Sequence, residues 1–405
     1  MKIPLVLAAT AMLMGGAARA DCAFENDVDV KILAAAFEAW KAVTDAMAEC
    51  GNVQAELDQE FRTKQPAAFA ANPSLYQIGG VSNGTITPLL NEGTIRPLDD
   101  LVEKYGQHLQ PNQLIRINGE IMAVAMMVNT FELTYRSDLF EEYGIDVPTD
   151  YDGLLAAAET LKDAEGIDYP LGAMTKSGWD LAMEFINVFQ SSGEPLVNDD
   201  STPNINNETG MNTLELLKAL SDYMDPEFLV SDSTYVQQQL QQGRIAMANI
   251  WASRAGAVDN EAESSVVGKV ETAMSPIAPF GDRPVATIWW DGIVIARNIS
   301  DEAAEAAFRV AMEGMDTEMV EANNDAAVWL IQGYEPGRLA QGAIATATHD
   351  PAPLSYPSTV EMGLMHTALG NEVAAYLTGS RSAERTLDAI EASYSTAARE
   401  AGVLN

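Results

Sequence analysis

The stretch VDVKILAAAFEAWKAVTDAMAECGNVQAEL, residues 28–57, contains the patterns of a strand, a helix and a second strand in immediate succession. Residues 28–33 are apolar enough for a buried strand, and residues 53–57 form the second run. Between them, apolar side chains recur at helical spacing and are expected to face a core: Phe37, Trp40, Val43 and Met47. Strand–helix alternation of this kind indicates a parallel sheet that is covered by helices.

The same alternation continues toward the C-terminus. A third strand is predicted at 75–78, then a tight turn at 79–84 and a helix at 85–90. Asn118-Gly119, between two apolar runs, is a hairpin signal. Further helices are predicted at 138–143, 151–164, 211–223, 301–314 and 382–401, and a strongly apolar strand region at 285–296. A length of 405 residues suffices for two domains. The alternation of strands and helices predicts the α/β class, with mostly parallel sheets flanked by helices.

The first twenty residues have the features of a secretory signal peptide. Lys2 supplies a positive charge, residues 3–14 are mainly apolar, and Ala18-Arg19-Ala20 places small residues where signal peptidase reads them. Cleavage is therefore expected before Asp21. An uncleaved anchor is the alternative, but the apolar run is too short for a hydrocarbon layer of roughly 30 Å. The mature chain is expected to be soluble and periplasmic.

Charge and cysteine content narrow the possible partners. The formal net charge is −36, and such a surface repels phosphate, which argues against nucleic acid and anionic membranes. Cys22 and Cys50 are the two cysteines, and an exported pair normally forms a disulfide. A nucleophilic cysteine is the alternative interpretation. Asp21 precedes Cys22 and no Leu-x-x-Cys lipobox is present, so a lipoprotein is not expected.

Three segments, in matching order and spacing, resemble family 1 extracellular solute-binding proteins of ABC transporters, which include the maltose-binding proteins. The first is YRSDLF at 135–140 with Pro148-Thr149, similar to the family's Tyr-Asn-Lys-Asp-Leu-Phe and Pro-Thr-Thr-Trp. The second is QGRIAM at 242–247, similar to a Gly-Lys-Ala-Ala-Met block that is followed by a Trp. The third is DGIVI at 291–295, similar to a Gly-Gly-x-x-Ile strand.

The resemblance implies two α/β lobes joined by hinge crossings, with a ligand in the cleft between them. By analogy the first lobe comprises residues 21–128 and 282–327, and the second 129–281 and 328–405. The resemblance also implies that the chain is not an enzyme. A small solute and the cognate ABC permease in the inner membrane are then the expected partners, and the chain is expected to be a monomer.

Sugars present apolar C–H faces and a rim of hydroxyls, so a sugar site needs aromatic rings and planar hydrogen-bonding groups. Four tryptophans fall in segments that the resemblance places at the cleft: Trp179, Trp251, Trp289 and Trp290. Trp40 and Trp329 are interpreted as core residues. Because neighbouring strand residues point to opposite faces, one of the pair 289–290 is expected to reach the ligand.

Polar residues beside these tryptophans complete the predicted ligand site. Asp291 follows the pair and can accept hydrogen bonds from hydroxyls. The other candidates flank the tryptophans or the first crossing: Lys176, Asp180, Asn249, Ser253, Arg254, Asn129 and Glu132. A last group follows the predicted third strand, at the strand end where open α/β sheets bind ligands: Gly80, Ser82 and Asn83. Small residues there are explained by close approach of the backbone to a ligand.

Other ligands and activities remain as alternatives. Tryptophans beside carboxylates also suit a cationic solute such as a betaine or polyamine, and Arg136, Lys176 and Arg254 suit an acidic sugar. Residues 80–84 fit the Gly-x-Ser-x-Gly motif of serine hydrolases, with His349 or His366 as a downstream partner of Ser82. Too few residues precede that motif for the usual hydrolase sheet, so this is the weaker hypothesis.

Metal and cofactor signals are few. The three histidines, His108, His349 and His366, have no metal-binding spacing. The Asn- and Asp-rich loop at 198–208 lacks the acid spacing of an EF-hand, which leaves calcium binding there undecided. Without a GxGxxG or Walker motif, neither a nucleotide nor any other cofactor is expected.

Overall fold

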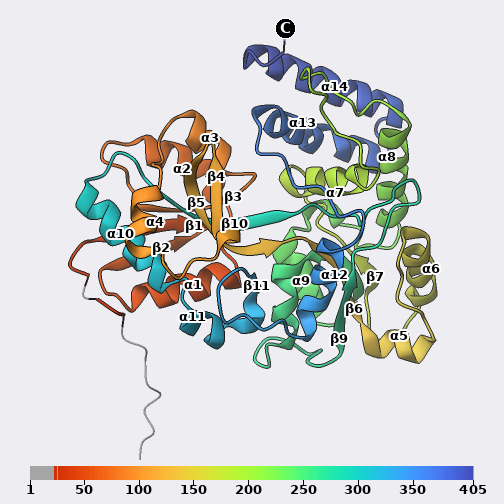
Figure 1. Ribbon diagram of the computed structural model, residues 1–405. Coiled ribbons are helices and arrows are strands. Elements are labelled where there is room, and N and C mark those ends of the chain that lie inside the picture. The colour runs from red at the N-terminus through yellow and green to blue at the C-terminus, as the bar shows by residue number, and fades with distance from the viewer. Residues whose placement is uncertain (1–21, 25, 405) are drawn as a thin grey trace, which may run out of the picture.

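The computed structural model describes residues 22–24 and 26–404, arranged as two lobes side by side (Figure 1). The signal peptide predicted at 1–20 and its cleavage before Asp21 lie outside the described residues. Each lobe is built around its own β-sheet. In the described part of the chain, no helix combines the length and apolarity needed to cross a bilayer.

The first lobe contains a seven-stranded sheet. Its strands are β1 (Val30–Ala34), β2 (Val53–Leu57), β3 (Ile78–Ser82), β4 (Leu114–Ile117), β5 (Glu120–Asn129), β10 (Trp289–Ile295) and β11 (Val328–Trp329). They lie in the order β11-β5-β10-β3-β1-β2, and β4 pairs with β5 at the Asn118-Gly119 hairpin. Both hairpin residues have positive φ, 53° and 90°, as the predicted turn requires.

Helices cover the first sheet and enclose its core. They are α1 (Glu38–Ala48), α2 (Phe61–Ala70), α3 (Ile86–Asn91), α4 (Asp99–Tyr105), α10 (Asp301–Glu313) and α11 (Thr317–Ala322). Trp40 is 1 % exposed and Trp329 is 3 % exposed, so both are core residues, as predicted. Cys22 and Cys50 form the expected disulfide, which joins the chain ahead of β1 to the end of α1.

The second lobe contains a four-stranded sheet and most of the long helices. Its strands are β6 (Phe131–Arg136), β7 (Tyr169–Gly172), β8 (Ile245–Trp251) and β9 (Val270–Met274), in the order β7-β8-β6-β9. Its helices are α5 (Ser137–Tyr143), α6 (Tyr151–Leu161), α7 (Trp179–Gln190), α8 (Glu208–Ser221), α9 (Ser233–Gln241), α12 (Gln341–Ala347), α13 (Val360–Leu377) and α14 (Ala383–Glu400). In Figure 1, α13 and α14 lie together at the outer edge of this lobe.

The α/β class and the two-lobed architecture are confirmed, but the sheets are mixed rather than mostly parallel. β1 pairs in parallel with β2 and β3, whereas β10 runs antiparallel between β3 and β5. The reason is the route of the chain. β5 runs out of the first sheet toward the second lobe, and β10 returns from that lobe in the opposite direction. A single residue, Thr130, separates β5 in one sheet from β6 in the other.

Three passages connect the sheets: β5 to β6, β9 to β10, and β11 to α12. A further stretch of the C-terminal segment returns to this region, because Ser355 pairs with Ile288 just ahead of β10. The lobes are thus joined by adjacent extended segments, which suits hinge motion. The lobe boundaries expected from the sequence, 128/129, 281/282 and 327/328, stay a prediction.

Candidate functional site

A cavity of about 130 Å³ lies between the two lobes, where the passages meet. Both lobes supply its walls: the first through β3, β5 and β10, the second through the end of β8 and the start of α7. Ten of the residues predicted from the sequence line it: Ser82, Asn129, Lys176, Trp179, Asp180, Trp251, Ser253, Arg254, Trp289 and Asp291. Their role as ligand contacts remains a prediction.

Strand register explains the composition of the first lobe's wall. Asp291 of β10 pairs with Ser82 of β3 on one side and with Met127 of β5 on the other. Trp289 and Asp291 lie on the face of the strand that lines the cavity. Trp290 lies between them in the chain and packs on the other face, against an apolar cluster that contains Phe69 and Val81. The structure therefore does not bring Trp290 to the cavity.

Asn249 and Glu132 are also absent from the cavity walls, because both are used inside the second lobe. The Asn249 amide donates to Tyr151 Oη at 3.2 Å and to the Val285 carbonyl at 3.0 Å. Glu132 is 0 % exposed, and burial raises the pKa of its carboxyl well above the ordinary value. A fully enclosed carboxyl of this kind is part of the lobe's interior.

Gly80 and Asn83 were predicted on the basis of a turn at 79–84, and this turn begins later than expected. β3 continues to Ser82, so Gly80 is inside a central strand. A Cβ at Gly80 would lie 2.4 Å from Ala34 Cβ and 2.8 Å from the Trp40 ring. The glycine is therefore required by packing beneath α1, not by approach of a ligand. The Asn83 amide donates to the Ile288 and Tyr356 carbonyls, which ties the end of β3 to the hinge.

Replacing Gly80 by Ala tests this reassignment. The added methyl group overpacks a strand–helix interface, and such changes typically cost about 1–3 kcal/mol. We expect the free energy of unfolding, measured in urea, to fall by about this amount. The dissociation constant of a bound ligand should stay within about twofold of the parent's, and a large loss of affinity in a stably folded variant would restore the original prediction.

The tryptophans at the cavity form one continuous aromatic wall. The Trp251 ring meets Phe131 edge-on at 4.6 Å and Trp289 edge-on at 5.6 Å between centroids. Trp289 in turn lies 4.3 Å from Tyr356 and 6.0 Å from Trp179. The indoles are thus gathered at the groove between the lobes rather than scattered through separate cores.

Arg62 is the principal cavity residue that the sequence did not suggest. It lies in the first turn of α2, and its guanidinium carbon lies 4.4 Å from the centroid of the Trp179 ring in the opposite lobe. Its Nε is buried and donates to no described residue. No helix was predicted at 61–70, so no sequence pattern placed this arginine near the cleft. The other lining residues that the sequence analysis did not propose are Ala35, Phe37, Gln59, Glu60, Phe61, Thr85, Asp232 and Ser233.

Burial in the cleft shifts the pKa values of its charged groups. It raises the pKa of Asp291 to about 7 and that of Asp180 to about 6, the latter shift being opposed by the positive charge of Arg62. Burial lowers the pKa of Arg254 to about 10, so this side chain stays protonated at neutral pH. No hydrogen bond from a described residue contributes to the pKa of either aspartate.

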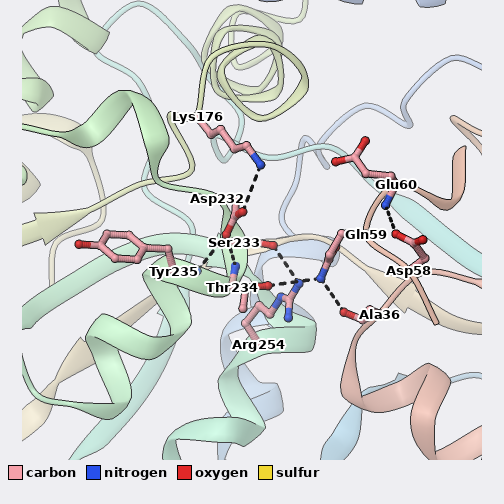
Figure 2. Close-up of polar contacts among 10 residues, drawn as sticks. All are labelled: Ala36, Asp58, Gln59, Glu60, Lys176, Asp232, Ser233, Thr234, Tyr235 and Arg254. Carbon is pink, nitrogen blue, oxygen red and sulfur yellow. Dashed lines mark hydrogen bonds and ion pairs between the residues drawn. The ribbon is translucent and has the colours of Figure 1, made fainter. Parts of the chain in front are cut away.

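The cleft is closed in this structure by contacts between the lobes (Figure 2). The Gln59 amide, in the first lobe, donates to its own lobe's Ala36 carbonyl at 2.7 Å and to Thr234 Oγ1 of the second lobe at 3.3 Å. On the second lobe's side, Arg254 donates to Ser233 Oγ at 2.9 Å. Figure 2 shows Gln59 and Arg254 lying close together at the rim.

The arrangement that a serine hydrolase needs is not formed. The Ser82 hydroxyl lies 3.3 Å from Thr85 Oγ1, not beside an imidazole. His366 is buried and hydrogen-bonded to Tyr356 Oη and the Trp179 carbonyl, and His349 interacts with the Pro351 carbonyl. The hydrolase hypothesis is therefore wrong as a description of Ser82 in this fold.

Two lobes, a hinge and a closed polar cavity define a protein of the ligand-binding class. The sequence model of the family "Bacterial extracellular solute-binding protein" matches residues 32–312, more than half of the chain, and the chain belongs to this family. A probable ABC transporter-binding protein of Deinococcus radiodurans is 24% identical over 266 residues. That match covers 62% of this chain and 61% of the relative, less than two thirds of its length.

Solved structures share the fold over nearly the whole chain. An ABC transporter solute-binding protein of Agrobacterium radiobacter K84 in complex with ribitol is 21% identical, with a TM-score of 0.80 over 91% of this chain and 98% of its own. One from Agrobacterium vitis S4 with bound D-mannitol is 18% identical, with a TM-score of 0.78 over 92% and 99%. Maltose-bound MalE3 of T. maritima is 19% identical, with a TM-score of 0.78 over 90% and 98%.

Proposed function

We propose that this protein is the periplasmic component of an ABC importer, which captures a sugar or polyol in the cleft and delivers it to a permease. Membership of the extracellular solute-binding family supports export and binding. The ligands bound in the similar solved structures, ribitol, D-mannitol and maltose, support the ligand class. Cleavage before Asp21, the lobe division at the boundaries given above and a monomeric state belong to the same proposal.

One observation carries the choice of ligand class: the cavity contains charged groups of both signs that lack hydrogen-bond partners among the described residues. Arg62 can only donate hydrogen bonds, and its buried Nε has no acceptor among the described residues. Asp180 and Asp291 accept hydrogen bonds when ionised, and neither receives one from a described residue. A hydroxyl group both donates and accepts, so a neutral polyhydroxylated solute satisfies all three residues at once.

The alternative ligands satisfy fewer of these groups. A betaine has no hydrogen to donate to Asp180 or Asp291, and a polyamine has no acceptor for Arg62. Arg62 moreover occupies the position over the Trp179 ring where a ligand cation would lie. An acidic sugar would place its carboxylate close to two buried aspartates. The unpartnered groups therefore favour a neutral solute.

Closure of the two lobes is then coupled to ligand binding. A solute that touches both lobes binds the closed form more tightly than the open form, and only this difference shifts the equilibrium. Micromolar affinity corresponds to about 8 kcal/mol of net binding free energy. The closed surface, which differs from the open one, is what the permease recognises in this proposal.

A thermal-unfolding screen of sugars, polyols, betaines and polyamines tests the proposed ligand class. A true ligand at about 100 times its dissociation constant should raise the free energy of unfolding by about 2.7 kcal/mol. We expect this shift from a sugar or polyol and not from glycine betaine or putrescine. Stabilisation by the cationic solutes alone would contradict the proposal, and sedimentation analysis of the same samples tests the monomeric state.

A further inference from the structure

The indole rings of the cavity wall expose very little of their faces. Trp251 is 8 % exposed and Trp289 is 5 % exposed. A tryptophan side chain buries up to about 250 Å², so these fractions leave no more than about 20 Å² of each ring accessible. That area corresponds to a ring edge. It is too small for the stacked contact by which an aromatic platform recognises the apolar face of a sugar ring.

Neighbouring side chains cover both of these rings. Phe131 covers Trp251 from the neighbouring strand of the same sheet, where the two residues are paired in register. Tyr356 packs on Trp289 from the adjacent hinge segment. Gly84 also lies against Trp289, since a Cβ at Gly84 would be 2.6 Å from the ring. Trp251 and Trp289 also meet each other across the cleft, with centroids 5.6 Å apart.

Trp179 is covered as well, by two side chains of different origin. His366 of α13 stacks on it, with centroids 5.0 Å apart and ring planes 25° from parallel. Arg62 approaches the ring to 4.4 Å from the first lobe. The aromatic side chains therefore shape the cavity and exclude water from its wall. The groups left to contact a ligand are polar.

The volume of the cavity matches a small ligand. A volume of about 130 Å³ holds on the order of ten water-sized groups, because one such group needs about 10–15 Å³ measured in this way. A five- or six-carbon polyol has a comparable number of heavy atoms. A disaccharide has roughly twice as many.

We propose that the ligand is an acyclic polyol of five or six carbons, an alditol, rather than a sugar in its ring form. This inference rests on the proposed function and narrows it. An open chain carries a hydroxyl on every carbon and exposes no flat C–H face that needs an aromatic platform. It can bend so that its hydroxyls reach Asp291 and Arg62 of the first lobe and Asp180 of the second.

Calorimetric titration with matched pairs tests the proposal. D-Mannitol and D-mannose, and D-glucitol and D-glucose, share a six-carbon skeleton; in each pair the alditol is the reduced, open-chain form and the aldose closes to a pyranose. We expect at least one alditol, with ribitol and D-arabitol included for the five-carbon case, to bind at least tenfold more tightly than any of the pyranoses. Equal or tighter binding of a pyranose would overturn the alditol assignment.

The same titrations separate this inference from the proposed function. Binding of a pyranose or of maltose, with alditols weaker, would overturn only the alditol assignment and leave a sugar-binding protein. Binding of glycine betaine or putrescine, with neither sugars nor alditols bound, would overturn both. Failure of every sugar and polyol to bind would also overturn both.

Arg62→Gln provides an independent measurement. Loss of the guanidinium removes a buried donor for ligand hydroxyls, so we expect the affinity for the best alditol to fall at least tenfold. Arg399→Gln, an exposed arginine in the last turn of α14, is the matched control and should bind like the parent. Circular dichroism establishes that both variants are folded, and full alditol affinity in folded Arg62→Gln would overturn the role of Arg62 as a donor to the ligand.

Discussion

Replacing Asp291 by Asn is expected to weaken ligand binding about 100-fold, equivalent to about 2.7 kcal/mol. The carboxylate of Asp291 is presented to the cavity by the central strand β10 and receives no hydrogen bond from the part of the chain that the structure describes. Ligand hydroxyls are therefore its partners, and hydrogen bonds to a charged group contribute about 1.5–3 kcal/mol. Calorimetry with the solute found in the screen measures the loss.

The same substitution should leave the ligand-free protein as stable as the parent or more stable. A carboxylate held out of water without a partner is destabilising, and the amide removes that cost. Asp163→Asn, at an exposed position after α6, is the control and should change neither affinity nor stability. Parallel losses of affinity and of unfolding free energy in Asp291→Asn would indicate a structural role instead.

The pH dependence of binding gives this prediction a second readout. The pKa of Asp291 is raised from 3.8 to about 7 in the folded, ligand-free protein. The folded state thus holds a proton that the unfolded state has lost, so the unfolding free energy falls as pH rises from about 4 to 7. Ligand hydroxyls favour the ionised form, so affinity should rise about tenfold between pH 5.5 and 8.

Asp180, whose pKa is raised to about 6, contributes to the same slope. In Asp291→Asn the increase in affinity with pH should be reduced to the part due to Asp180. An affinity that falls over this interval in the parent protein would contradict the assignment of the aspartates as acceptors for ligand hydroxyls.

Removing the disulfide with Cys22→Ser and Cys50→Ser is expected to lower the free energy of unfolding by about 3.5 kcal/mol. The bridge joins residues 28 apart, and closing a loop of that length in the unfolded chain accounts for a stabilisation of this size. It lies at the start of the first lobe, and neither cysteine lines the ligand cavity. Affinity should therefore be unchanged wherever the variant is folded.

Urea unfolding, with and without reductant, measures this effect. The parent protein should lose stability on reduction, whereas the double serine variant should be insensitive to reductant. A variant that matches the oxidised parent, or one whose affinity falls while its fold is intact, would contradict the prediction.

Local sequence determined the helices and strands whose hydrogen-bonding and packing partners are near them in the chain. The strand, helix and strand within 28–57 follow from apolar spacing, and Trp40 is in the core because that spacing places it there. Asn207 caps the start of α8, since its side chain accepts from the Gly210 amide three residues later. Family motifs added the two-lobed arrangement, which no periodicity contains.

Tertiary structure decided which side chains face the cavity and what each does there. Strand alternation predicts that one of Trp289 and Trp290 points inward, but only the pairing of β10 between β3 and β5 shows which one. Arg62 reaches Trp179 from 117 positions away in the chain, and Gly80 is constrained by Ala34 and Trp40. These contacts depend on how two separately folded lobes and their crossings meet, and nearest-neighbour patterns in the sequence carry no information about that geometry.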